Sequence, residues 1–295
     1  MRLVAFKTRD SKGVGILNGD GDGVVDVGSR LGYSDLGQLV HDGRLADCAD
    51  LAGEAPDHAV ADIVFDPVIR TPAHIFCVGA NYSEHRREVA DSGIPRAPTE
   101  HPTIFTRFPE TIVGHQRDLV KPHGTDSFDF EGELAAIIGV GGRRIPRDEA
   151  LRHVAGYSCF NDGSIREWQF HTSQVQPGKN FTRTGSLGPW LVTADEIADP
   201  HHLDIQTRLN KVVVQHSNTS QMIFDIPTII AYVSTLVPLE PGDVIATGTP
   251  SGVGFTRNPP LFMNPGDTCE ITVEGIGTLR NTVVSEHLGK PDGVG

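Results

Sequence analysis

The sequence predicts a β-rich α+β fold, with a small β module over residues 1–70 followed by a larger β-rich domain over residues 71–295. Two observations lead to this prediction. Short apolar runs of strand length, bounded by Gly, Pro, Asn and Asp, outnumber segments with helical periodicity. The first 70 residues also hold three such runs around one tight turn, which is typical of a small leading module.

The composition argues against several classes of protein. The chain has 295 residues, 38% of them apolar, which is enough to bury a sizeable core. A formal charge of −13 and the lack of a Lys/Arg run argue against a nucleic-acid partner. No stretch approaches the roughly 20 apolar residues that cross a bilayer, so no membrane partner is expected. Four cysteines without C-x-x-C spacing favour a reducing, cytoplasmic location.

In the leading module, strands are expected at 2–7, 13–17 and 23–27, with a turn at 18–23. That turn has the Asn-x-Asp-x-Asp-Gly spacing of a calcium loop. The twelfth position, where such loops place a bidentate glutamate, is Ser29. A hairpin turn is therefore the better interpretation.

In the larger domain, strands are expected at 74–78, 134–140, 187–193, 203–214, 243–247 and 268–273. Helical periodicity is clearest at 147–155 and 226–236, and Pro227 suits the first turn of the second helix. The predicted strands outnumber the predicted helices, so the domain should be β-rich.

Three carboxylates are the best candidates for a functional site. Glu131 and Glu133 lie one residue apart at the start of an apolar run, and Asp162 follows after 28 intervening residues. On an extended segment Glu131 and Glu133 share a face. Two anions at the entrance to a core are costly unless a cation or solvent neutralises them. The set suits Mg²⁺ or Mn²⁺ better than Zn²⁺, and the alternative is a solvated strand edge with an unrelated aspartate.

A second candidate lies in the charged segment 81–88, which is expected to form a short exposed helix. His85 and Glu88 are three residues apart and share a face of such a helix. A carboxylate beside an imidazole fixes its tautomer and raises its basicity, as a general base requires. Because the chain has 13 histidines, an ordinary surface imidazole is the alternative interpretation.

Several other motifs give no assignment. Lys179 lies in a loop whose sequence indicates no role. Segment 247–254 follows a predicted strand and is either an anion-binding loop or a tight turn, since the Gly-Lys-Ser/Thr of a P-loop is missing. The glycines at 139–142 do not form a dinucleotide fingerprint, because Arg143 to Pro146 follow where a helix should begin. No Gly-x-Ser-x-Gly elbow supports a serine hydrolase.

Six motifs, in this order, resemble the fumarylacetoacetate hydrolase (FAH) family over about residues 71–284. They are VGANYSEH at 78–85, FEGELA at 130–135, VAGYSCFND at 154–162, GPWLVT at 188–193, NTSQM at 218–222 and LEPGDVIATGTPSGVG at 239–254. The resemblance is to the acylpyruvase and 2-oxo-diacid hydratase or isomerase branch. It implies an FAH-type domain of rolled, mixed β-sheet, usually assembled as a homodimer.

The resemblance also implies roles for individual residues. The metal ligands for Mg²⁺ or Mn²⁺ would be Glu131, Glu133 and Asp162. His85 and Glu88 would form a catalytic dyad on a lid, and Lys179 would face the substrate beside the metal.

Three further positions are implied to lie near the substrate. Gln169 and Thr249 match residues that contact substrate oxygens, and Arg166 matches an arginine close to the site. The chain departs from the family pattern at Gly163 and Ile165, and it has Arg107 where many members have a lysine. The last departure suggests a different pocket on the substrate side.

The activity implied by the resemblance is metal-dependent hydrolysis of a carbon–carbon bond in a 2,4-dioxo acid of the acylpyruvate or fumarylpyruvate type. The bond would break through an enolate, with His85 activating water. One alternative is decarboxylation, isomerisation or hydration of an oxaloacetate-like 2-oxo diacid at the same site. Another is a catalytically silent ligand-binding protein of the same fold.

Overall fold

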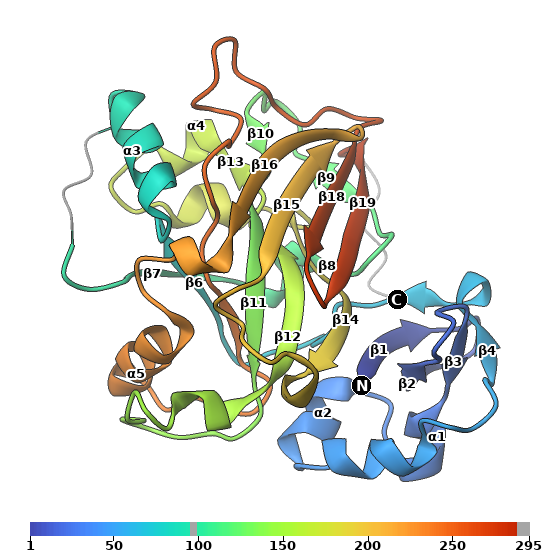
Figure 1. The fold of residues 1–295 in the computed structure, drawn as a ribbon. Helices are drawn as coiled ribbons and strands as arrows, with labels where there is room; N and C mark the ends of the chain where they lie inside the picture. The colour runs from blue at the N-terminus through green and yellow to red at the C-terminus, as the bar shows by residue number, and fades with distance from the viewer. Residues whose placement is uncertain (95–98, 288–295) are drawn as a thin grey trace.

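The structure, a computed structural model, describes residues 1–94 and 99–287. Most of its regular structure is β, in one long mixed sheet, a five-stranded sheet and a two-stranded sheet (Figure 1). Neighbouring strands of the long sheet follow the order β4 (His58–Ala59), β3 (Gly23–Val25), β2 (Lys12–Leu17), β1 (Arg2–Lys7), β14 (Gly185–Thr193), β12 (Val154–Asn161), β11 (Gly132–Ile138), β17 (Val244–Ala246), β6 (Ile75–Gly79), β7 (Thr103–Arg107). Two short strands lie off this path: β5 (Val64–Phe65) pairs with β1, and β8 (Ile112–Val113) pairs with β14.

The other two sheets are smaller. The five-stranded sheet has the order β16 (Val212–Asn218), β15 (Asp204–Leu209), β18 (Thr268–Val273), β19 (Gly277–Ser285), β9 (Leu119–Lys121), and the two-stranded sheet pairs β10 (Phe128–Asp129) with β13 (Ser164–Ile165). The predicted β-rich class is confirmed.

The helices are few and short. They are α1 (Val27–Leu31), α2 (Leu36–His41), α3 (Ser83–Asp91), α4 (Arg166–Gln169) and α5 (Ile226–Leu236), with 3₁₀ turns η1 (Leu45–Leu51), η2 (Val60–Asp62), η3 (Pro109–Thr111), η4 (Ala150–His153), η5 (Gln176–Lys179), η6 (Ala194–Glu196) and η7 (Thr219–Gln221). None of them, over the residues described, is long and apolar enough to cross a membrane.

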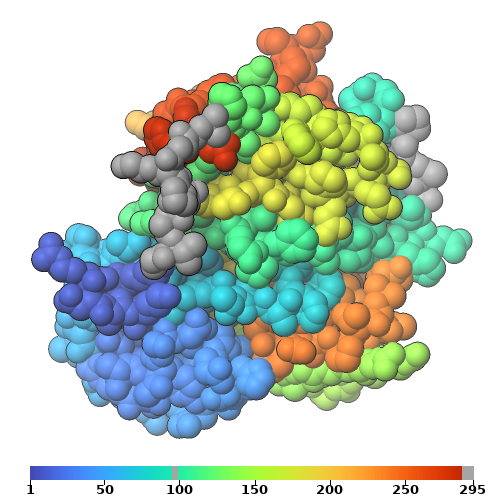
Figure 2. All heavy atoms as spheres, turned by 180° about the vertical axis from the view of Figure 1, so that it is seen from behind, coloured from blue at the N-terminus to red at the C-terminus, as the bar shows by residue number. Residues whose placement is uncertain are grey.

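The N-terminal strands continue the long sheet. β1 pairs antiparallel with β14 through Arg2 opposite Val192 and Leu3 opposite Leu191. In Figure 2 the N-terminal residues form a lobe at one corner of the molecule, packed against the rest. The division of the chain at residue 70 stays a prediction, because a hydrogen-bonded ladder crosses between the two parts.

Strand β11 is the centre of the fold, and all seven of its residues are buried. Leu134, Ala136 and Ile138 enter one apolar core, whereas Ala135 and Ile137 enter a second core on the opposite face. This division follows from the alternation of side chains along a strand. With both faces covered, the strand is an uninterrupted apolar run from Leu134 to Ile138.

Helix α5 forms where its periodicity predicts it. Asp225 caps its N-terminus by accepting a hydrogen bond from the Thr228 N–H, and Pro227 lies in its first turn. Its apolar face packs into the first of the two cores through Ile226, Ile229, Ile230 and Val233.

Two predictions of secondary structure are wrong. The helix expected at 147–155 is only the 3₁₀ turn η4, because Val154 already pairs with Ile138 of β11. The strand expected at 203–214 is the hairpin β15–β16. Its turn residues Asn210 and Lys211 both have positive φ, +51° and +71°, as a tight hairpin turn requires. In both cases the pairing between strands, and not the local pattern of apolar residues, determines the structure.

Four adjacent strands of the long sheet bring four chain segments together at one end of the strands. β11 and β12 are antiparallel, with Gly132 opposite Asn161, so the start of β11 lies beside the end of β12. β17 and β6 are parallel, so their carboxyl ends meet. The turn into α3 follows β6, and the loop 247–257 follows β17. Residues before β11, after β12, after β6 and after β17 therefore surround one site.

Candidate metal centre and active site

The three carboxylates predicted to bind a metal lie together. Oxygens of Glu131, Glu133 and Asp162 are all within 4.8 Å of one another, and all three residues are buried. The strand register explains this, since the Asp162 N–H donates to the Glu131 carbonyl at 2.9 Å. Glu131 lies just before β11 and Glu133 lies within it, so their side chains share a face as expected.

Two of the three carboxylates are neutralised by buried cations. The Lys179 Nζ donates to Glu131 Oε2 at 2.8 Å and to Asp162 Oδ2 at 2.7 Å. The second oxygen of Asp162 accepts from Arg107 Nη1 at 2.7 Å. Burial alone would raise the pKa of Glu131, but the charges of Lys179 and Arg166 outweigh it and hold that pKa below its usual range.

Glu133 has a different environment. Its Oε2 accepts from the Gly248 N–H at 2.8 Å, and no cationic side chain lies within ion-pair distance of it in the described part of the chain. Burial and the charges of Asp162 and Glu131 raise the pKa of Glu133 well above its usual value. Gly248 has φ +101°, and a Cβ there would lie 2.6 Å from Asn81 Cβ, so only glycine fits.

The site has one more buried carboxylate than it has buried cationic side chains. Four buried carboxylates meet three buried cations, namely Asp129, Glu131, Glu133 and Asp162 against Arg107, Arg166 and Lys179. The excess charge lies on Glu133. An all-oxygen donor set with uncompensated negative charge suits a hard divalent cation such as Mg²⁺ or Mn²⁺. The residues present therefore fit the predicted metal.

Replacing Lys179 with methionine should destabilise the metal-free protein by about 3–5 kcal/mol, because two buried carboxylates lose their shared partner. A divalent cation should restore part of this loss, since it would neutralise the same oxygens. Urea unfolding with chelator and then with Mn²⁺ measures both effects. Equal stability of the variant and the original protein in chelator would contradict this account of the charge balance.

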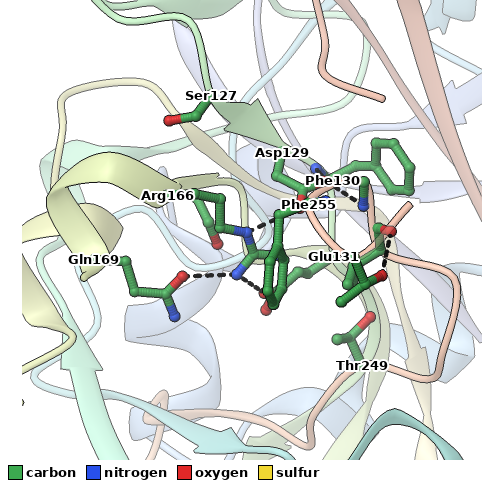
Figure 3. A network of polar contacts seen from close by, with 12 residues as sticks. Ser127, Asp129, Phe130, Glu131, Arg166, Gln169, Thr249 and Phe255 are labelled. Carbon is green, nitrogen blue, oxygen red and sulfur yellow. Dashed lines mark hydrogen bonds and ion pairs between the residues drawn. The ribbon is translucent and has the colours of Figure 1, made fainter. Parts of the chain in front are cut away.

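Arg166 organises the substrate side of the site. Its Nε donates to Asp129 Oδ2 at 2.8 Å, and its Nη1 contacts Glu131 Oε1 and Gln169 Oε1, both at 2.7 Å. Figure 3 shows the guanidinium between Asp129 and Gln169, with the Phe255 ring, whose centroid is 4.4 Å from Cζ, alongside. Its Nη2 is buried and has no hydrogen-bond partner among the described residues. That nitrogen is available to an anionic ligand.

His85 and Glu88 form the predicted pair on α3. His85 Nδ1 lies 3.0 Å from Glu88 Oε2, while Glu88 Oε1 accepts from the Gly252 N–H at 2.9 Å and from Thr256 Oγ1 at 2.8 Å. Burial alone would raise the pKa of Glu88, but the hydrogen bonds from His85, Thr256 and Gly252 lower it. An ionised Glu88 favours the tautomer with hydrogen on Nδ1, which leaves Nε2 as the basic atom. His85 is buried, which argues against an ordinary surface imidazole.

One pocket contains most of the predicted residues. Its lining includes His85, Glu131, Glu133, Arg166, Gln169, Lys179 and Thr249, with an apolar wall that includes Phe105 and Phe255. Asp162 and Glu88 do not line the pocket, but they contact its lining through Lys179 and His85. Thr249 has little capacity left for a substrate, since its hydroxyl donates to the Gly132 carbonyl and accepts from Gln215.

The sequence interpretation missed one residue of the site and misplaced another. Asp129 accepts from Arg166 and from the Gly254 and Phe255 N–H groups, and its position two residues before Glu131 was a usable signal. Arg107 was expected to alter the substrate side of the pocket. The structure corrects this expectation, because Arg107 is buried against Asp162 and is not part of the pocket lining.

Comparison with known proteins assigns this fold to a family. Residues 74–284 match the family described as fumarylacetoacetate (FAA) hydrolase, C-terminal. The chain belongs to the FAH family. The human oxaloacetate tautomerase FAHD2A, mitochondrial, is 38% identical over 293 residues, which cover 96% of this chain and 92% of that protein.

Two solved structures share the fold of this FAH-family chain. Fumarylacetoacetate hydrolase from Exiguobacterium antarcticum is 34% identical with a TM-score of 0.83, over 97% of this chain and 100% of that one. Maleylpyruvate hydrolase from Sphingobium sp. SYK-6, in complex with manganese(II) and pyruvate, is 28% identical with a TM-score of 0.79, with the same coverage. Both likenesses support the FAH fold of this chain, and the second structure contains manganese(II) and pyruvate.

Proposed function

We propose that this FAH-family chain catalyses keto–enol tautomerisation of a 2-oxo diacid of the oxaloacetate type, with Mg²⁺ or Mn²⁺ as its cofactor. The observation that carries the proposal is the His85–Glu88 pair, which supplies a proton-transfer group to the same pocket as the carboxylates and Arg166. The 38% identity to an oxaloacetate tautomerase over nearly the whole chain favours this reaction over others of the family.

Each step is assigned to a group of this chain. The free Nη2 of Arg166 binds the carboxylate next to the 2-oxo group, and Gln169 fixes the orientation of that guanidinium. Glu131, Glu133 and Asp162 would hold a divalent cation, which would supply Lewis-acid chemistry to the site when bound. Lys179 offsets negative charge that develops on the 2-oxo oxygen, in a pocket where solvent screens little.

His85 moves the proton. In the enol-to-keto direction the C2 hydroxyl loses a proton and C3 gains one. The reaction therefore needs a group that donates a proton to C3, and the number of protons on the substrate does not change. Nε2 of His85 can carry that proton, because Glu88 stabilises the imidazolium through Nδ1. In the reverse direction the same nitrogen takes the C3 proton.

A second candidate is carbon–carbon hydrolysis of an acylpyruvate. The same His85–Glu88 pair could activate a water, and the likeness to maleylpyruvate hydrolase favours this candidate. Both reactions involve an enolate that takes a proton at C3. In tautomerisation the intact substrate forms this enolate, whereas in hydrolysis the enolate is released when the carbon–carbon bond is cleaved.

A substrate panel separates these reactions. Protein loaded with Mg²⁺ or Mn²⁺ is mixed with oxaloacetate and with several acylpyruvates, and ¹H NMR follows the products beside a chelated control. We expect faster equilibration of the enol and keto signals of oxaloacetate. Pyruvate plus a free carboxylic acid would assign hydrolysis instead, and pyruvate from oxaloacetate alone would assign decarboxylation. An unchanged panel would contradict the proposal and favour a silent binding protein.

A further inference from the structure

A second cavity adjoins the active-site pocket. The two share Ala80, Thr103, Phe105 and Val175 in their linings, so a ligand can extend from one to the other. Their volumes differ more than tenfold, at about 40 Å³ for the inner pocket and about 470 Å³ for the second cavity. A small head group fits the inner pocket, and the second cavity offers space for the rest of a longer ligand.

The described lining of the second cavity carries one positive charge. Arg86 is the only charged side chain among these residues, and the polar lining residues include Thr103, Ser173 and Gln174. Arg86 is half-buried and forms no ion pair with any described residue. The one hydrogen bond from its side chain to a described residue, from Nη2 to the Ala80 carbonyl, is long at 3.4 Å. A guanidinium has five N–H donors, so most of those on Arg86 are not used by the described residues.

The position of Arg86 on α3 places it next to the catalytic pair. It follows His85 directly, and one residue along a helix turns the side chain by about 100°. His85 therefore lines the inner pocket, and Arg86 lines the cavity beside it. Arg87, the next residue, is exposed and lines a separate outer groove with Glu84 and Glu88. The helix carries two adjacent arginines, only one of which faces the route of a bound ligand.

We propose that Arg86 binds the distal carboxylate of a 2-oxo diacid longer than oxaloacetate, and thereby selects dicarboxylates over monocarboxylates of equal length. The inference rests on the proposed function. In that function the 2-oxo acid end of the substrate lies at Arg166 and the carboxylate cluster, and this placement directs the other end toward Arg86. A planar guanidinium with unused donors matches a carboxylate through two parallel hydrogen bonds. The substrate class is therefore a 2-oxo diacid with a longer carbon chain than oxaloacetate.

Calorimetry with matched pairs of acids tests this proposal. The Mn²⁺-loaded protein is titrated with 2-oxoadipate and 2-oxohexanoate, six carbons each, and with the corresponding seven-carbon diacid and monoacid. We expect the diacid of at least one pair to bind about 10- to 100-fold more tightly, as a charge-assisted contact predicts. Arg86→Met should remove this difference and leave monoacid affinity unchanged. Arg86→Lys should restore part of it, and Arg87→Met is the control with the same loss of charge.

The outcomes separate this inference from the proposed function. Equal affinity for diacid and monoacid at both lengths in the original protein would overturn the role of Arg86, while oxaloacetate tautomerisation would still stand. A preference that survives in Arg86→Met, or that is lost equally in Arg87→Met, would also overturn it. Failure to bind any of the acids, together with an inactive oxaloacetate assay, would overturn the proposed function and this inference with it.

Discussion

Replacing Glu133 with glutamine is expected to lower divalent-cation affinity and turnover by roughly 100-fold or more. Loss of a residue that only supports a metal ligand costs about 10–100-fold, and loss of a ligand should cost at least that. Glutamine keeps the shape and the acceptor oxygen for the Gly248 N–H, so the loop after β17 should stay in place. Titration with Mn²⁺ and a steady-state assay measure the two losses.

The same variant should be more stable than the original protein when no metal is present. The folded-state pKa of Glu133 is raised, so between the unfolded and folded pKa values the folded protein binds more protons than the unfolded chain. Stability then falls as pH rises through that window, and at neutral pH the metal-free protein carries the cost of the charge. Glutamine removes this cost, and the gain should disappear at low pH.

Urea unfolding in chelator at two pH values tests this gain in stability. Glu270→Gln, on β18 and outside the site, is the matched control. A Glu133→Gln protein that is less stable without metal, and that binds Mn²⁺ as tightly as before, would contradict the assignment of Glu133 as a metal ligand.

Replacing His85 with alanine is expected to lower tautomerisation about 10²–10⁴-fold, the range typical of a lost general acid or base. Metal affinity should be nearly unchanged, since His85 is not one of the three carboxylates. Turnover and Mn²⁺ affinity, measured on the same preparation, check both expectations. His202→Ala, at an exposed histidine outside the pocket, controls for the loss of an imidazole.

The His85→Ala protein also distinguishes the candidate reactions. Tautomerisation and hydrolysis both need the imidazole, whereas decarboxylation of oxaloacetate needs no activated water. Pyruvate formation from oxaloacetate that persists in the variant would therefore point to a decarboxylase. Full tautomerase activity in the variant would show that another group carries the proton.

The parts of the site that the sequence could predict depend on short-range geometry or on whole motifs. Alternation along a strand places Glu131 and Glu133 on one face, and helical spacing places His85 beside Glu88. Joining Asp162 to the two glutamates required the register of β11 and β12, which the order of the family motifs implied but no local pattern contained.

The remaining parts depend on contacts between distant segments. Arg107 meets Asp162 across 55 positions of the chain, and Lys179 meets Glu131 across 48. No spacing rule connects such residues, so Arg107 was placed on the wrong side of the site. The helix expected at 147–155 failed for a similar reason, because pairing of Val154 with β11 outweighs the local periodicity.

The rate at which enolic oxaloacetate loses its ultraviolet absorbance tests the central claim most directly. The rate is measured with metal-loaded protein, after chelation, and after Mn²⁺ is restored, with a protein-free solution at equal metal as the background for catalysis by free cation. We expect faster decay only with the metal-loaded original protein, loss on chelation and recovery on restoration. A rate equal to that of the protein-free solution at every metal concentration would contradict the assignment of this site to tautomerisation.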